Sequence, residues 1–203
     1  MRGWAVIVLI GAVMFLFALR QIHPFLAVND PVSGGAMVVE GWAPDYALES
    51  AIAEFRKDHY EKLYVTGGPM ERGAPLSEYK TYAELGAATV VKLGLSGDVV
   101  QAVPAPWVRR DRTHACAVAL RDWLREHGVS PGKVNLITVG PHARRSRLLF
   151  QKVLGNDVTM GVTAIPDKDY DPDKWWRSSQ GVRVVLSEMI AYVYVRIVPS
   201  AAR

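Results

Sequence analysis

The residues of this chain that could do chemistry stand in polar segments, most of them directly after an apolar run typical of a buried strand. In a parallel sheet the carboxyl ends of the strands share one edge, so side chains far apart in the sequence would converge on one crevice there. The candidates, in chain order, are Glu40, Gly67, Gly68, Glu78, Arg112, Thr113, His142 and Arg145. Carboxylates, arginines and a histidine together indicate a site that binds an anion and handles protons.

The strongest of these signals lies in residues 135–150, where an apolar run, a Gly-Pro turn and the start of an apolar helix face follow one another. His142 and Arg145 would stand at a helix amino terminus, where unpaired N–H groups and the helix dipole favour an anion. We expect His142 to be neutral and able to accept a proton or donate to a phosphoryl oxygen, with backbone capping as the alternative. Arg144 and Arg145 point about 100° apart on a helix, and we expect Arg145 to face the crevice.

Other candidates each have a structural alternative. Gly67 and Gly68 lack both the dinucleotide glycine fingerprint and the Lys-Ser/Thr of a phosphate loop, so a plain turn explains them equally well. Glu78 belongs either to the site or to the first turn of a helix, where the dipole stabilises an acidic residue. Arg112, in the charged turn 109–112, is either a ligand or an ordinary solvated residue.

Glu40 is harder to explain by structure alone, because an ionised carboxylate at a buried strand end needs a partner, which an arginine could provide. Cys116 lies near an apolar helix stripe, and we expect it in the core. The acidic and histidine candidates Glu40, Glu78, His114 and His142 have no metal-ligand spacing, so no metal site is predicted. No motif identifies a cofactor.

Apolar runs alternate with amphipathic segments along residues 36–198, which predicts an α/β fold with a mostly parallel sheet of about five strands and helices on both faces. The expected strands are residues 36–39, 62–66, 98–103, 136–139 and 158–165. Helices are expected over 45–57, from Ser77 to about Leu93, from the turn at 109–112 to Gly128, from 142 to about 155, and from about Lys174 to Pro199.

Residues 4–19 carry no charge and are bracketed by Arg2 and Arg20, which predicts a membrane segment. A cleaved signal peptide is the alternative, but no clear small-x-small cleavage site follows, so we favour an anchor. The expected organisation is an anchor at 1–20, a linker on the membrane surface at 21–35 and one α/β domain at 36–203. The apolar end of the last helix is too short to span a bilayer; we expect it to pack on the domain, with docking on the bilayer as the alternative.

The composition agrees with one domain that has an apolar appendage. The chain has 203 residues, 50% of them hydrophobic, and a formal net charge of +4. The pI is near 9.2, which is only mildly basic, and the basic residues are spread evenly along the chain. This does not predict a nucleic-acid partner, but it suits phosphorylated small molecules or an anionic membrane surface. The single cysteine excludes an internal disulfide.

Over residues 36–194 the pattern resembles bacterial envelope proteins of the YdcF, SanA and ElyC type. The shared features are short motifs in the same order: Thr66-Gly67-Gly68, Ser77-Glu78, Thr113 with Ala117, Thr138 with His142 and Arg145, and a late Glu188. Two positions depart from the family pattern, because Glu40-Gly41-Trp42 replaces a Gly-Gly and Cys116 replaces an Asn.

This resemblance implies a Rossmann-like three-layer domain held to the bacterial inner membrane by an amino-terminal helix, with the domain facing the periplasm or the cell exterior. It implies a role in envelope integrity, peptidoglycan or lipid-carrier-linked polysaccharide metabolism. Our first hypothesis is a protein that binds or processes a phosphorylated small-molecule or lipid-linked substrate, as a hydrolase or transferase if it is an enzyme. The alternatives are a binder of S-adenosylmethionine or another nucleotide-type ligand, which one branch of the family suggests, and a non-catalytic envelope scaffold.

Overall fold

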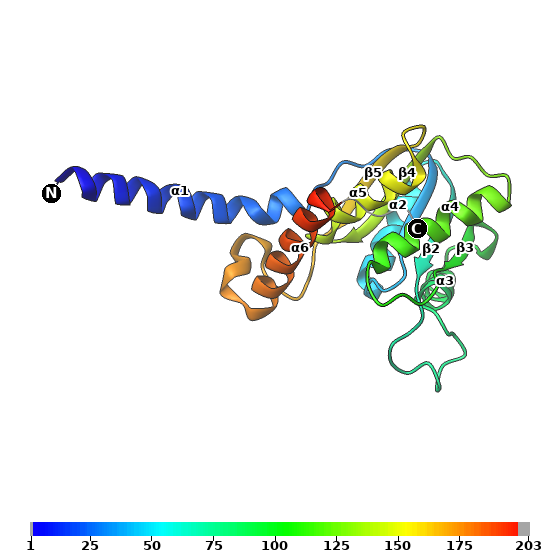
Figure 1. Ribbon diagram of the computed structural model, residues 1–203. Helices are drawn as coiled ribbons and strands as arrows, with labels where there is room; N and C mark the ends of the chain where they lie inside the picture. Colours follow the sequence, from blue (N-terminus) through cyan, green and yellow to red (C-terminus); the bar gives the residue numbers. More distant parts are fainter. Residues whose placement is uncertain (1, 199–203) are drawn as a thin grey trace.

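The computed structural model describes residues 2–198 and confirms the predicted α/β class (Figure 1). Five strands form one parallel sheet in the order β3-β2-β1-β4-β5. The strands are β1 (Gly35–Glu40), β2 (Tyr60–Gly67), β3 (Val100–Pro104), β4 (Lys133–Val139) and β5 (Thr159–Ile165). The chain builds outward from β1 through β2 to β3 and then returns to the other side of β1 with β4, so the topological switch point lies between β1 and β4.

Helices cover both faces of the sheet. Helices α2 (Asp45–Lys57) and α3 (Tyr82–Lys92) pack on one face, and α4 (Arg112–Glu126) and α5 (His142–Leu154) pack on the other. Strand β1 shows why the sequence folds this way: Val38 joins the α4/α5 core while Met37 and Val39 join the α2/α3 core. A strand buried on both faces has no polar side, and its apolar run is therefore continuous.

Helix α3 begins later than the sequence predicted. Thr81 caps it in a capping box, in which the Thr81 side chain accepts from the Glu84 N–H and Glu84 accepts from the Thr81 N–H. This pair satisfies N–H groups that a helix start leaves without partners. The expected start at Ser77 and Glu78 is wrong, and both residues belong to the loop between β2 and α3.

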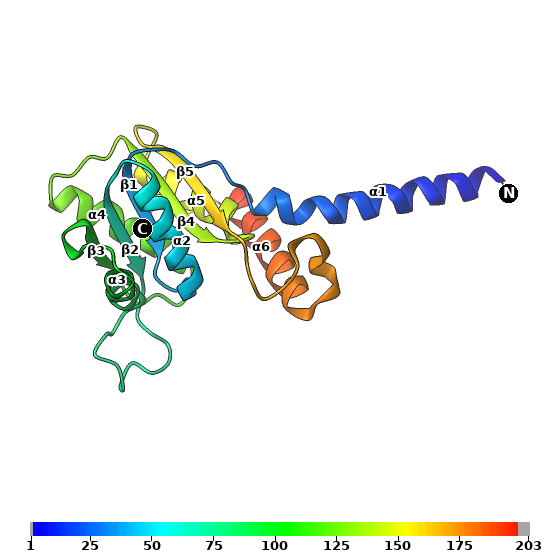
Figure 2. The ribbon, with the colours of Figure 1, turned by 180° about the vertical axis from the view of Figure 1, so that it is seen from behind.

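The amino-terminal helix α1 (Arg2–Leu26) projects from the domain as a single long rod (Figures 1 and 2). Its segment Val6–Leu26 is long and apolar enough to cross a membrane, with a mean hydropathy of 2.1. The expected linker is wrong over residues 21–26, which continue the helix because Ile22 and Leu26 pack in an apolar cluster with the carboxy-terminal helices.

The carboxy-terminal part consists of a short 3-10 helix, η2 (Pro172–Arg177), and α6 (Ser179–Ile197); the other 3-10 turn, η1 (Gly97–Val99), precedes β3. The last helix was expected to start near Lys174 with a pause at Gly181. The break lies at Ser178 instead, which caps α6 by accepting from the Gly181 N–H. Trp175 and Val185 bury against Leu26, so α1, η2 and α6 form one packed unit.

Candidate functional site

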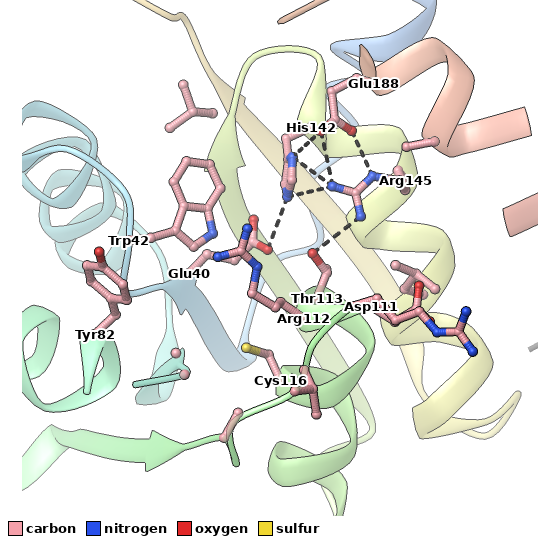
Figure 3. A pocket seen from close by; sticks show the side chains of 18 of the residues that line it. Glu40, Trp42, Tyr82, Asp111, Arg112, Thr113, Cys116, His142, Arg145 and Glu188 are labelled. Carbon is pink, nitrogen blue, oxygen red and sulfur yellow. Dashed lines mark hydrogen bonds and ion pairs between the residues drawn. The ribbon is translucent and has the colours of Figure 1, made fainter. Parts of the chain in front are cut away.

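A cavity of about 790 Å³ opens at the carboxyl ends of the strands, at the switch point of the sheet. It is lined by all but one of the residues that the sequence singled out: Glu40, Gly67, Gly68, Arg112, Thr113, His142 and Arg145 (Figure 3). The predicted convergence on one edge is therefore what the structure shows. The exception is Glu78, which is exposed in the loop before α3 and does not line the cavity.

Glu40 ends β1 at the floor of the cavity, with a side chain only 2% exposed. Its carboxylate accepts hydrogen bonds from the hydroxyl of Thr138 and, at 3.3 Å, from that of Ser146, and His142 Nε2 lies 3.6 Å from its Oε1. Burial by itself raises the pKa of Glu40, but the nearby charge of His142 and the hydrogen bond from Thr138 outweigh it and lower the pKa. The nearest cationic partner of Glu40 is thus His142 rather than an arginine.

His142 opens α5 and lies between two carboxylates. Its Nδ1 is 2.8 Å from Glu188 Oε1 on α6, and its Nε2 faces Glu40. Burial lowers the pKa of His142, but the charges of Glu40 and Glu188 and the hydrogen bond to Glu188 prevail and raise it to about 9. The expectation of a neutral His142 is wrong, because two acids from other elements oppose the effect of the helix terminus.

Arg145 faces the cavity, as expected, and completes the arrangement one helical turn after His142. Its Nε donates to Glu188 Oε2 at 2.8 Å, its Nη2 donates to Oε1 at 3.1 Å, and its Nη1 donates to Thr113 Oγ1 at 3.3 Å. Burial raises the pKa of Glu188, but the hydrogen bonds from His142 and Arg145 lower it to about 2. Arg144 points elsewhere and donates to the carbonyl of Phe25.

We call Glu40, His142, Arg145 and Glu188 the charged quartet (Figure 3). Its two carboxylates balance two basic side chains when His142 is protonated. Glu188 bridges His142 and Arg145, and Arg145 Nη2 lies 3.1 Å from both ring nitrogens. Glu188 fixes the imidazole through Nδ1, as the third group does in a catalytic triad. At 3.6 Å from Glu40, the Nε2 proton is not committed to a short hydrogen bond, so His142 can deliver it to a substrate oxygen.

The mouth of the cavity carries both arginines and acidic residues, and its walls carry aromatic rings. Arg109 and Arg110 stand in the turn between β3 and α4, and Arg112 is the first residue of α4. Arg112 is 69% exposed and forms an ion pair with the equally exposed Glu71. Water screens this pair strongly, so the guanidinium can turn to a ligand at little cost. The aromatic lining residues are Trp42, Tyr46, Tyr82, Trp107 and Tyr194.

Gly67 has a packing reason to be glycine. A Cβ atom there would lie 2.6 Å from the backbone nitrogen of Ala83, at the start of α3. Gly68 accepts a hydrogen bond from the Tyr82 N–H at 2.9 Å. The pair therefore lets α3 approach the end of β2, which supports the plain-turn interpretation while both glycines still line the cavity.

Reasoning from residue types missed three members of the site: Glu188, Trp42 and Tyr82. Trp42 packs edge to face on His142, with ring centroids 5.0 Å apart, and Tyr82 lines the cavity from α3. Glu188 appeared only through the family resemblance. The signal that could have found it is its position as the one acidic residue within the apolar sequence of α6.

Cys116 lies in the core, as predicted, and burial raises the pKa of its thiol to about 12. A thiol with this pKa is not a nucleophile at neutral pH. Within residues 2–198, no three His, Cys, Asp or Glu side chains are grouped so that they could hold a metal ion.

Comparison of the chain with protein-family models, with curated proteins and with solved structures found no match. The function is therefore inferred from the residues of the site.

Proposed function

We propose that this protein is a membrane-anchored cell-envelope protein that binds and processes a phosphorylated envelope intermediate, such as a polyprenyl-phosphate-linked sugar. One observation carries the proposal: His142, held between the carboxylates of Glu40 and Glu188, lines a cavity whose mouth bears arginines. Positive groups that converge at strand ends and at the start of α5 suit a phosphate group.

The chemistry supported by this geometry is cleavage or transfer at a phosphate ester. Arg109, Arg110 and Arg112 would neutralise the phosphate oxygens at the mouth. Water in hydrolysis, or an acceptor hydroxyl in transfer, would attack phosphorus and lose its proton to the solvent. His142 would act as general acid and give its Nε2 proton to the leaving oxygen as the P–O bond to that oxygen breaks. Glu40 is too buried and too fully hydrogen-bonded to reach a substrate, so it would keep His142 protonated, while Glu188 and Arg145 would hold the ring in place.

A lipid-linked substrate is supported by where the cavity lies. Helix α6 forms one wall of it, and α6 packs against the end of the membrane helix α1. The assignment to a bacterial envelope, with the domain in the periplasm, follows from the resemblance of the motifs to YdcF, SanA and ElyC.

The contacts of Glu40 speak against a nucleotide-type ligand. Binding of S-adenosylmethionine would use a carboxylate on the ribose hydroxyls, the role that Glu40 was expected to fill. Its oxygens instead accept from Thr138 and Ser146 and face His142. No free carboxylate is left at that strand end for a ribose.

The test is release of phosphate or sugar phosphate from polyprenyl-phosphate-linked sugars by the full chain in detergent. His142→Gln should lower turnover by roughly 10²- to 10⁴-fold, the usual contribution of general acid catalysis. Glu78→Gln, an exposed change outside the cavity, is the matched control and should retain full turnover. If the wild type neither binds nor turns over these lipids, the proposal fails.

Membrane topology separates the proposal from its main alternative. A reporter fused after Arg203 should be active in the periplasm. A cytoplasmic signal would overturn the envelope substrate and make nucleotide-type ligands the next class to assay. A scaffold would instead tolerate His142→Ala and Arg145→Ala in cells but lose function when α1 is removed.

A further inference from the structure

We infer that α6 forms a second membrane-contact surface, which lies on an anionic phospholipid bilayer beside the point where α1 enters it. The surface is the exposed stripe Leu186, Ile190, Val193 and Ile197, called the α6 stripe below. The stripe is distinct from the membrane-spanning residues of α1 and from the cavity.

The α6 stripe is a continuous apolar face without a partner among the described residues. Its members are 42%, 72%, 43% and 73% exposed, and their spacing of four, three and four residues places them on one side of the helix. The other sides of α6 are occupied. Val185, Met189 and Tyr192 pack in the cluster with α1, while Glu188 and Ala191 line the cavity. A face of this kind marks an interaction site.

The end of α1 places a bilayer surface next to this stripe. A helix of 25 residues is about 37 Å long, more than the roughly 30 Å of a hydrocarbon core, so its last turns lie at the membrane interface. Those turns pack against α6 and η2, at the end of the domain from which α1 departs (Figures 1 and 2).

Aromatic and arginine side chains lie at the same end of the domain, beside the last turns of α1. The Arg20 guanidinium lies 5.6 Å from the ring centre of Trp176 on η2, and Phe25 packs edge to face on Tyr192 at 5.5 Å. Trp and Tyr rings beside arginines are the usual residues of a membrane–water interface.

Charge favours a bilayer over a second copy of the chain. Arg183 and Arg196 are exposed near the two ends of the α6 stripe, and the one acidic residue of α6, Glu188, is turned inward to His142 and Arg145. The outward face of α6 is thus apolar and basic, which fits acyl chains and anionic headgroups. In an antiparallel pairing with a second copy, Arg183 of each chain would approach Arg196 of the other, and like charges oppose that contact.

The test uses the full chain in vesicles of equal parts phosphatidylglycerol and phosphatidylcholine. Ile190→Cys is labelled with an environment-sensitive fluorophore, which is selective because Cys116 is buried. Val129→Cys is the matched control, 38% exposed and located just before β4 at the opposite edge of the sheet. A lipid with a nitroxide headgroup should quench the label at position 190 several-fold more strongly than the label at position 129.

Charge removal gives the second measurement. Arg183→Gln and Arg196→Gln should each lower the ratio of docked to undocked domain by roughly fivefold, the factor that corresponds to about 1 kcal/mol per basic residue at an anionic surface. Replacing the mixed vesicles by vesicles of phosphatidylcholine alone should also lower the ratio of docked to undocked domain.

Equal quenching at positions 190 and 129 would overturn the inference. Self-quenching between labelled copies without quenching by lipid would assign the stripe to a second copy and overturn it as well. If Ile190→Cys unfolds at a lower temperature than the wild type, the same measurement is made with Ile197→Cys, at the carboxy-terminal end of the stripe. The quenching assay contains no substrate, so a negative result would leave the proposed function intact. A negative result in the turnover assay would likewise leave the membrane contact of the α6 stripe intact.

Discussion

Replacing Glu188 by Gln tests the charged quartet directly. Glu188 is 13% exposed and bridges His142 and Arg145, with contacts of 2.8 Å to each. Gln keeps the shape and an acceptor oxygen but removes the charge. Two cations then share Glu40 as their only remaining carboxylate in the quartet, so the substitution should lower the proton affinity of His142 and destabilise the fold.

The size of the effect follows from the pKa of His142. This pKa is about 9 in the folded protein against an ordinary 6.5. With about 1.4 kcal/mol for each tenfold change in proton affinity, the fold favours protonated His142 by roughly 3 kcal/mol. Glu40 and Glu188 share this stabilisation, so the pKa of His142 should fall by about one pH unit in Glu188→Gln. The free energy of unfolding should fall by about 2 to 3 kcal/mol, near the lower limit for breaking a buried ion pair.

The difference in stability between wild type and Glu188→Gln should depend on pH with a predictable sign. The pKa of His142 is raised, so its contribution is complete below pH 6.5 and is lost as the pH rises toward about 9. The pKa of Glu188 is lowered, so its contribution is complete above pH 4.5 and is lost as the pH falls toward about 2. The difference should therefore be largest between pH 4.5 and 6.5, smaller at pH 9 and mostly lost near pH 2.

Two measurements check this prediction on the full chain in detergent. Imidazole NMR titration, with the His142 signal assigned by its loss in His142→Gln, gives the pKa of His142 in wild type and variant. Denaturant unfolding at several pH values gives the stability difference, with Glu78→Gln as a control that should match the wild type. A wild-type His142 that titrates near pH 6.5, or a stability difference that does not change with pH, would refute the electrostatic account of the site.

Two further predictions concern the surroundings of the site. Gly67→Ala should destabilise the protein by about 1 to 3 kcal/mol, because the new methyl group would lie 2.6 Å from the Ala83 nitrogen. Thermal unfolding measures this against Gly132→Ala, whose methyl group meets nothing within 4 Å; equal melting temperatures would contradict the packing role of Gly67. Cys116 should resist alkylation at pH 8 in the folded protein and react once it is unfolded, because burial raises the pKa of its thiol to about 12. Rapid alkylation of the native protein, followed by mass spectrometry, would show that the thiol is accessible.

Much of the fold follows from local patterns in the sequence. Helix α2 spans Asp45–Lys57, as its apolar spacing predicts, and the five strands lie where the apolar runs do. The predicted helix boundaries were wrong where a capping residue sets the start of the helix. The capping box of Thr81 and Glu84 starts α3 late, and Ser178 divides the last helical segment. Both are short-range capping signals that are present in the sequence itself.

The sequence alone also determined that polar residues after separate strands meet at one edge, because parallel strands leave no other arrangement. It could not determine the partners of His142 or the charge of its ring. The helix terminus near His142 is a local effect and predicted a neutral imidazole, whereas Glu40 and Glu188 stand 102 positions before it and 46 positions after it. Only the tertiary structure brings these carboxylates within 3.6 Å and 2.8 Å of the ring, and electrostatic interaction depends on distance in space rather than along the chain.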